Sequence, residues 1–519
     1  MQKSYTKNYL KIYLWQGVSL VLNFLSMFVV IPYLTSDPTT YGIYTVCISF
    51  SIFLAYADLG FMSAGQKYAS ESFATGDRDE EIKIIGFTNF ILLVFLILFS
   101  VIFLFLSTRP ELLVKDLKTI EQKHVASSLL VLLAIFTPTT LLQRLLQMIF
   151  GIRMEDFIIQ RTNTIGSIIR ILSVLWFFRD GNYNIIGYFL FTQIVNLIAA
   201  LITLQFARVK YNYDFKKLFL SLSFNKVIFK KMKGLAFTSL FVTISWILYY
   251  ELDTVAIGKL LGAREVAIYA IGLTVLAFFR SILGILFSPF NVRFNHFVGS
   301  GEEENLKSFY LQIVSILAPV VMFPIIAIAI FAKPLIITWV GGDYSDSVTA
   351  VQFLVFCNFF AFITYPTNFM LLAKERQKEM YIINTILPVV FWTGIVFTIG
   401  VWGVKSFAIF KFIAFLFSAV VLYRLMIGYL KINVLKSLKI IFSPLFLPTL
   451  FLTLTSFTVR QYMPDEKSKV YLVIVVGVMG VLILTSFVIL YLTSVKWRIQ
   501  LNKIIKGLGI NNFQKLNKK

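Results

Sequence analysis

The chain has few charged residues for its length, and this shortage excludes most soluble folds. Charged residues make up 14% of the 519 positions, whereas 58% are hydrophobic. Soluble domains carry about 25% charged residues. Mean hydropathy is +0.81, and the 54 phenylalanines are too many for a surface that faces water alone. An integral membrane protein is the class that fits this composition.

Cysteine and histidine are also scarce, which limits the chemistry that the chain can support. The two cysteines, Cys47 and Cys357, both lie in apolar runs and predict neither a disulfide framework nor a metal site. His124 and His296 stand alone in predicted loops. No GxxxxGKS or GxxxxGKT phosphate-binding loop is present, which argues against direct use of ATP. We therefore expect no catalytic residues, no metal and no cofactor.

Long apolar runs predict an all-α integral membrane protein with fourteen transmembrane helices. A helix needs about 20 mainly apolar residues to cross a bilayer. Eleven runs of this kind are free of charge, and three more contain one or two charged residues. Because the runs are continuous, they exclude a membrane β-barrel, and the first one indicates a retained helix, not a signal peptide. The expected spans are residues 12–36, 38–57, 84–108, 125–143, 161–178, 181–207, 234–250, 266–292, 308–332, 347–373, 380–404, 406–430, 440–459 and 470–495.

The distribution of basic residues predicts that both termini are cytoplasmic. An even number of spans places both termini on one side, and predicted loops and tails on that side hold 28 lysines and arginines against 11 opposite. Cytoplasmic loops carry such an excess in membrane proteins. The richest loop, residues 207–233, holds eight basic residues and is expected to lie on the anionic inner leaflet. This asymmetry accounts for much of the net charge of +22 without nucleic acid as a partner.

Two acidic segments, GDRDEEIK at residues 76–83 and GEEENLK at residues 301–307, mark an internal repeat. Each follows a tyrosine-led helix, YGIYTV or VAIYAI, by 32 residues, and each is expected to cap the next helix with its acids. The repeat predicts two pseudo-symmetric six-helix lobes, a plan typical of transporters with a substrate site between the lobes. The expected parts are residues 1–206 (first lobe), 207–233 (basic linker), 234–430 (second lobe) and 431–519 (two further helices and a basic tail).

Charged and polar residues inside the predicted spans are the candidate site. A charge near the bilayer centre costs roughly 2.5–3.5 kcal/mol on insertion scales, so it usually faces a cavity or a partner. Arginines suit an anionic ligand, and nearby acids would hold them in place or carry a coupling cation. The expected cationic residues are Arg170, Arg280, Arg144, Arg293 and Lys11, the expected acidic partners are Asp58 and Asp253, and the expected polar lining is Gln16, Asn23, Asn163, Tyr250, Tyr269, Asn358 and Asn368.

A purely structural role stays open for several of these residues. A single serine or asparagine often serves as a hydrogen bond between helices. Arg144, Arg293 and Lys11 lie toward the inner ends of spans, where a long side chain can extend to the interface.

Two stretches resemble the bacterial polysaccharide-biosynthesis flippases of the multidrug/oligosaccharidyl-lipid/polysaccharide exporter superfamily. They are IPYLTSDPTTYGIYTVCISFSIFLAYADLGF at residues 31–61 and ELDTVAIGKLLGAREVAIYAI at residues 251–271. The order of these weak motifs, together with the topology of nearly the whole chain, carries the resemblance. Asp58 in DLG and Asp253 before GKLLG match the family pattern, and Arg170 and Arg280 take the general role of its cavity arginines.

The resemblance implies a flippase in the bacterial inner membrane and not an enzyme. Its substrate would be an anionic lipid-linked oligosaccharide, an undecaprenyl-diphosphate-linked unit of O-antigen, capsule or exopolysaccharide, moved from the inner to the outer leaflet by alternating access. A proton or sodium ion is left open as the coupling ion. Membrane lipids and polysaccharide-assembly proteins are the implied partners. Related flippases of lipid-linked precursors also have a groove for the lipid tail near the last two helices.

Two alternatives remain at the level of sequence. Multidrug export on the same fold would favour acidic residues for cationic drugs, and the predicted spans contain more arginines than acids. A membrane polymerase or glycosyltransferase would need a substantial outer loop with catalytic groups. The longest predicted outer loop, residues 109–124, offers no such set.

Overall fold

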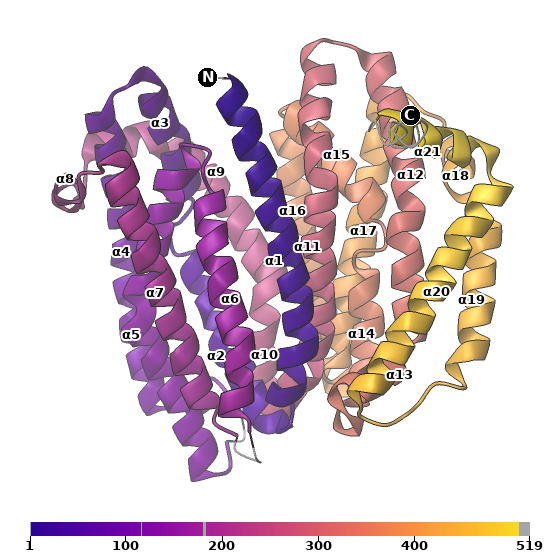
Figure 1. The fold of residues 1–519 in the computed structure, drawn as a ribbon, viewed down its shortest axis with the longest axis horizontal. Coiled ribbons are helices and arrows are strands. Elements are labelled where there is room, and N and C mark those ends of the chain that lie inside the picture. Colours follow the sequence, from indigo (N-terminus) through magenta and orange to yellow (C-terminus); the bar gives the residue numbers. More distant parts are fainter. Residues whose placement is uncertain (1, 116, 180–182, 508–519) are drawn as a thin grey trace, which may run out of the picture. The chain divides into compact units, whose positions relative to one another are not determined.

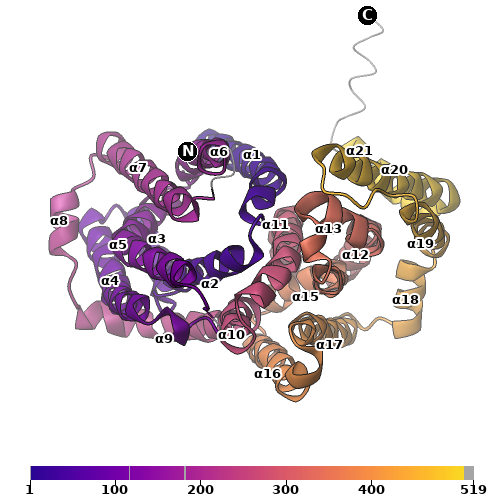
Figure 2. The same ribbon diagram turned by 90° about the horizontal axis from the view of Figure 1, so that it is seen from below.

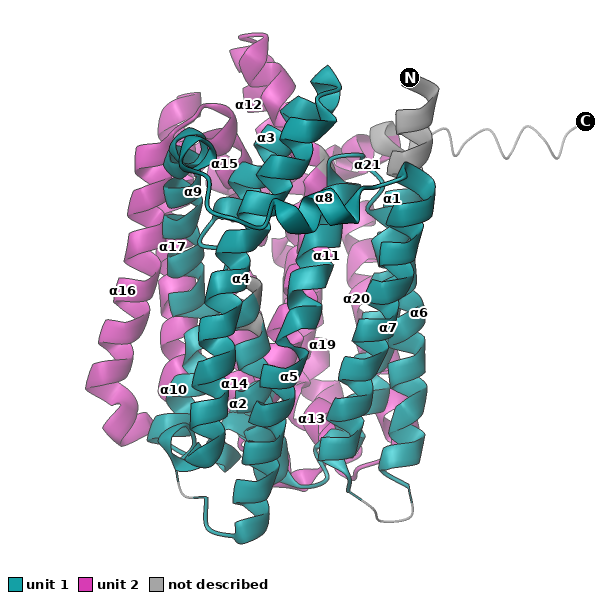
Figure 3. Ribbon diagram, turned by 90° about the vertical axis from the view of Figure 1, so that its left-hand side faces the viewer, with its two compact units in different colours: residues 1–270 teal, residues 271–519 magenta. Residues whose placement is uncertain are grey.

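A computed structural model of the chain describes residues 2–115, 117–179 and 183–507 (Figure 1). The chain is helical throughout these ranges, and no β-strand occurs in them. The molecule divides into two compact units, Met1–Ala270 and Ile271–Lys519 (Figure 3).

Unit 1 contains the helices of the first half of the chain. The apolar runs become long helices, and short breaks occur where glycine or polar residues interrupt them. Its elements are α1 (Gln2–Leu34), α2 (Pro38–Ala55), α3 (Phe61–Thr75), α4 (Arg78–Thr108), η1 (Pro110–Leu112), α5 (Ile120–Gly151), α6 (Phe157–Phe177), α7 (Ile185–Tyr211), α8 (Phe215–Leu220), α9 (Lys226–Trp246), the π-turn η2 (Ile247–Glu251), α10 (Leu252–Leu260) and the start of α11 (Ala263–Gly299).

Unit 2 begins within α11 and contains the second half. Among its candidate membrane spans the most buried is α12, of whose apolar window 72% is buried inside the protein. The remaining elements are α12 (Glu303–Ile330), α13 (Ala332–Val340), η3 (Gly342–Tyr344), α14 (Ser347–Phe356), α15 (Ala361–Ala373), α16 (Gln377–Trp402), α17 (Lys405–Leu430), α18 (Val434–Phe442), α19 (Phe446–Arg460), α20 (Lys469–Thr493) and α21 (Val495–Gly507).

The helices confirm a multi-pass membrane protein. Within the described ranges, ten helices are long and apolar enough to cross a membrane, and twelve if the bent pairs α14–α15 and α18–α19 each count as one span. The other two expected spans, residues 38–57 and 161–178, are helical as α2 and α6 but fall outside this set. The count of fourteen and the two six-helix lobes therefore stay predictions.

The two acidic segments lie at helix starts, as expected. Asp77 precedes α4 and accepts a hydrogen bond from the backbone N–H of Glu80 at 2.9 Å, which satisfies one of the free donors of the first turn. Glu302 takes the corresponding position before α12, but its side chain makes no capping hydrogen bond there. Side-chain capping is thus confirmed for the first segment and not for the second.

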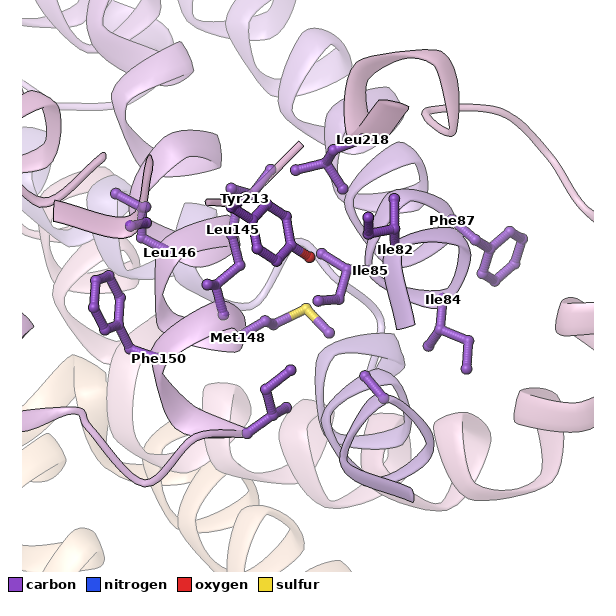
Figure 4. Close-up of a cluster of buried hydrophobic side chains, with 14 of the residues drawn as sticks. Ile82, Ile84, Ile85, Phe87, Leu145, Leu146, Met148, Phe150, Tyr213 and Leu218 are labelled. Carbon is purple, nitrogen blue, oxygen red and sulfur yellow. The ribbon is translucent and has the colours of Figure 1, made fainter. Parts of the chain in front are cut away.

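A buried hydrophobic cluster joins one end of the unit 1 helices. Figure 4 shows side chains of α4, α5 and the α7–α8 connection meeting there, among them Ile85, Met148 and Tyr213. Beside it, the guanidinium of Arg153 donates to both carboxylate oxygens of Glu81 at 2.8 and 3.1 Å. The two side chains are only 7% and 1% exposed, so α4 and the α5–α6 connection share a buried ion pair.

The break between α2 and α3 lets α9 approach closely. Gly60 has a φ of +79°, and a Cβ at this position would lie 2.3 Å from the carbonyl oxygen of Ala236. This contact and the packing of α3 on α9 place α9 in unit 1. The two compact units divide after Ala270, whereas the expected lobes end near residue 206 and begin again near residue 234. The functional lobes therefore stay a prediction.

Replacing Gly60 by alanine is expected to lower the thermal stability of the purified protein more than Gly76→Ala does. Both glycines have φ +79°, so alanine is strained at each. Nothing lies within 4 Å of a Cβ at Gly76, whereas Gly60 faces the α9 backbone. Thermal unfolding of both variants in detergent isolates the contribution of the contact between Gly60 and α9 to stability. Equal unfolding midpoints of the two variants would show that this contact does not contribute.

Candidate functional site

Five long helices of unit 1 and the start of α3 surround a polar cavity of about 800 Å³. Figure 2 shows α1, α2, α5, α6 and α7 arranged as a ring in this unit. The cavity is lined by both apolar and polar side chains, and the polar ones predominate. They are Gln16, Tyr44, Ser51, Gln66, Thr140, Gln143, Arg144, Gln147, Asp156, Gln160, Asn163, Thr192, Gln193, Asn196 and Thr203.

Carboxamide side chains are the main chemical feature of this lining. Eight of the lining residues are glutamine or asparagine, from α1, α3, α5, α6 and α7. Lining residues on one helix are three or four positions apart and so share one helix face, as do Gln143 and Gln147 with Thr140 on α5. Each carboxamide offers both donors and an acceptor, which matches the hydroxyl groups of a sugar. The lining is therefore suited to a large, neutral, hydroxyl-rich group.

Two charged side chains of opposite sign also line the cavity. Arg144 donates a hydrogen bond to Gln147 at 3.0 Å and interacts electrostatically with Asp58. Asp156 lies in the connection before α6, where burial raises the pKa of its carboxyl above the usual range. A carboxyl with a raised pKa holds its proton to a higher pH than an exposed one. The cavity thus contains one arginine and one carboxyl whose neutral form is favoured by burial.

Arg170 stands behind the cavity wall. Its guanidinium donates to Oδ1 of Asn196, which lines the cavity, and to Oγ of Ser167 at 2.6 Å. It also interacts electrostatically with Tyr44 and Tyr188. Arg170 is half-buried, and its hydrogen bond to Asn196 directs the guanidinium toward α7.

Three further expected residues of unit 1 lie at or near the cavity. Gln16 on α1 and Asn163 on α6 line it. Lys11 lies on α1 five residues before Gln16, and its ammonium is 4.8 Å from the ring centre of Phe157. Asn23, farther along α1, is exposed and does not line the cavity.

The two aspartates expected as charge partners make structural hydrogen bonds and do not line the cavity. Asp58 accepts from the backbone N–H of Met62 at 2.8 Å and so caps the start of α3. Asp253 is fully buried and accepts from the hydroxyl of Tyr269 at 2.6 Å. Tyr250 is buried as well, and its ring stacks on Trp246 at 4.1 Å.

Unit 2 holds the remaining expected residues. Arg280 on α11 interacts electrostatically with Tyr365 on α15. The guanidinium of Arg293 is exposed and lies 4.8 Å from the ring centre of Phe309. Asn358 is buried at the α14–α15 bend and donates to the carbonyl of Leu276 at 3.5 Å, whereas Asn368 is exposed.

Sequence reasoning missed most of the neutral residues in the cavity. Gln143 and Gln147 on α5, Gln160 on α6, and Gln193 and Asn196 on α7 were not predicted. A search for glutamine and asparagine at helical spacing inside charge-free runs would have found Gln193 and Asn196 on α7, whereas Gln147 on α5 follows Arg144 and lies beyond the run 125–143. Gln160 lay just outside its expected span because α6 begins four residues earlier, at Phe157.

A comparison with protein families places the chain in a class. Residues 7–294, more than half of the chain, match the family model described as "Polysaccharide biosynthesis protein", and residues 238–398 match the model MatE. The chain belongs to the polysaccharide biosynthesis protein family, and the resemblance seen in the sequence is confirmed. A comparison of sequences with curated proteins found no match.

Solved structures of the multidrug/oligosaccharidyl-lipid/polysaccharide exporter superfamily have a similar fold. The lipid II flippase MurJ, in an inward closed conformation, aligns with a TM-score of 0.63 and 14% identity over 94% of this chain and 99% of that one. A multidrug resistance MATE family transporter, in an inward-facing conformation, aligns with a TM-score of 0.62 and 14% identity over 79% of this chain and 95% of that one. The chain thus has the fold of these transporters.

Proposed function

We propose that the protein is a flippase for an undecaprenyl-diphosphate-linked oligosaccharide, such as a repeat unit of O-antigen, capsule or exopolysaccharide. The observation that carries this proposal is the amide-rich cavity of about 800 Å³ in unit 1. Its carboxamides suit sugar hydroxyls, and Arg144 supplies a cation for the diphosphate. Membership of the polysaccharide biosynthesis family and the fold shared with a lipid II flippase support the same substrate class.

The mechanism that we propose is alternating access in the bacterial inner membrane, with both termini cytoplasmic. The protein moves its substrate between leaflets and does not transform it. A ligand shifts a conformational equilibrium only through its different affinity for the two states, so polar contacts must change between them. Asp156 is the acid placed to couple a proton to that change, because it lines the cavity and its carboxyl pKa is raised by burial.

Multidrug export is the second candidate, favoured by the MatE match over residues 238–398. Export of cationic drugs would be served by acids in the cavity, and its charged lining consists of Arg144 and Asp156 within the described residues. One arginine and one aspartate give the cavity lining no excess of negative charge that would attract a cationic drug.

A reconstituted transport assay separates the two candidates. The full-length protein is placed in liposomes with a fluorescent undecaprenyl-diphosphate-linked oligosaccharide, and transfer across the bilayer is followed by an enzyme that trims only outward-facing glycan. We expect transfer faster than in protein-free liposomes and no uptake of a cationic dye. Dye transport without glycan transfer would overturn the flippase proposal in favour of drug export.

A further inference from the structure

The opposite side of the α6–α7 pair carries a second hollow, a groove of about 600 Å³. Apart from Arg161 and Thr162, its lining is apolar, and isoleucine is the most frequent residue in it. Ile165 and Ile169 on α6 and Ile194, Ile198 and Ile202 on α7 recur at spacings of four, so each set lies along one helix face. These side chains are 38–52% exposed, which leaves the groove uncovered by the rest of unit 1.

A single cation, Arg161, belongs to this groove. Its guanidinium lies 5.4 Å from the ring centre of Phe206, another lining residue. No carboxylate forms an ion pair with Arg161 in the part of the chain that the structure describes. A guanidinium without a protein anion, next to an apolar groove, complements a molecule with a phosphate head and a hydrocarbon tail.

The groove and the polar cavity share one wall. Gln160 lines the cavity and its neighbour Arg161 lines the groove. The hydroxyls of Thr162, in the groove, and Thr203, in the cavity, are hydrogen-bonded at 3.0 Å across the α6–α7 seam. Gly166 keeps this seam tight, since a Cβ there would lie 3.3 Å from a methyl group of Val195. A lipid in the groove would therefore have its head one helix wall away from the cavity.

We propose that this groove docks the polyprenyl chain of the carrier lipid, with the lipid's diphosphate on Arg161 before the glycan enters the cavity and the diphosphate passes to Arg144. The site rests on the proposed flippase function, because the shared wall with a glycan-suited cavity is what favours the carrier over a bulk membrane lipid. It is formed by α6 and α7 of unit 1, whereas the groove that the family resemblance implies for the lipid tail would be formed by the last two helices, which belong to unit 2.

Binding of undecaprenyl diphosphate without any glycan tests the charged end of the site. The full-length protein in detergent is titrated with this lipid, and bound lipid is counted by native mass spectrometry. We expect Arg161→Ala to weaken binding by at least about tenfold, the loss expected for a charge-assisted pair. Arg208→Ala is the matched control, because Arg208 is an exposed arginine on α7 outside the groove, and it should bind as the natural protein does. Equal affinity of the two variants would overturn the proposal.

Filling the groove tests the apolar part. Ile169→Trp places a large side chain in the groove, whereas Leu172→Trp adds the same group to an exposed position of α6 outside it. We expect only Ile169→Trp to weaken binding. Phosphatidylglycerol serves as a competitor, and displacement of undecaprenyl diphosphate at equal concentration would identify a general anionic-lipid site and overturn the assignment to the carrier.

The lipid-binding experiment and the transport assay can overturn the docking site and the flippase function independently of each other. Binding that depends on Arg161 and Ile169, without glycan transfer in liposomes, would leave the docking site standing and overturn the flippase proposal. Glycan transfer by the natural protein, with unchanged lipid binding in both variants, would overturn the docking site alone.

Discussion

Replacing Arg153 by methionine is expected to lower the free energy of unfolding by about 3–5 kcal/mol, because the change leaves the buried Glu81 carboxylate unpaired. The side chain of Glu81 is 1% exposed, and its ion pair with the Arg153 guanidinium at 2.8 Å compensates for the hydration that the carboxylate loses on burial. Arg153 also donates to the carbonyl of Ile149 at 2.8 Å and lies over the rings of Phe73 and Tyr211. One side chain thus links α3, α4, α5 and α7, and reversible unfolding of the protein in detergent measures its loss.

Two controls separate the buried charge from the lost contacts. The double variant Glu81→Leu and Arg153→Met removes both charges and is expected to recover much of the stability, since buried pairs are often replaceable by apolar residues. The exposed pair Lys217–Asp79 connects α8 and α4, and Lys217→Met should change stability little because water already screens it. A double variant no more stable than Arg153→Met would show that the rings and the carbonyl contact, not the unpaired charge, set the cost.

The apolar runs of the sequence predicted the long helices because crossing a bilayer requires continuous apolar length. The same criterion missed helices that carry charge. The apolar run 38–57 ended at Asp58, and the expected loop at residues 58–83 contains α3, whose Lys67 and Glu71 kept it from counting as a charge-free run. The amphipathic α18 was missed for the same reason, since Lys436 and Lys439 lie on it. Such helices are stabilised by one buried face, so a search for charge-free segments cannot find them.

The candidate site was predicted in part. Charge inside an apolar run pointed to Arg170, which bonds a lining residue, and charge at the inner end of a run pointed to Arg144, which lines the cavity. Polar stripes pointed to Gln16 and Asn163, which also line it. Asp58 was expected as a charge partner and does interact electrostatically with Arg144, but it also caps the start of α3. Asp253 was expected in the same role and accepts a hydrogen bond from the Tyr269 hydroxyl. Whether an aspartate accepts a backbone N–H depends on where a helix breaks, and Gly60, two residues after Asp58, marks that break in the sequence but was not predicted to be one.

Replacing Arg170 by alanine is expected to reduce glycan export at least about tenfold while the protein remains folded in the membrane. The change removes a charge-assisted hydrogen bond to Asn196, worth roughly 1.5–3 kcal/mol, and frees the carboxamide that lines the cavity. Arg170→Lys keeps the positive charge but not the planar fork, so intermediate export is expected. Surface polysaccharide in cells that depend on this protein, normalised to its abundance in the membrane, is the measurement.

Arg280→Ala is expected to reduce export in the same way, and comparison of the two variants tests whether both units contribute charge. Arg280 lies in unit 2, where its electrostatic partner Tyr365 stacks on Phe287 at 4.9 Å. Arg208→Ala removes an exposed arginine of α7 and should leave export unchanged. Loss of export in Arg170→Ala alone would confine the cationic requirement to unit 1, where the cavity is. Normal export in both single variants would refute the roles of both arginines, and the amide-rich lining would then have to hold the substrate with Arg144 as its cation.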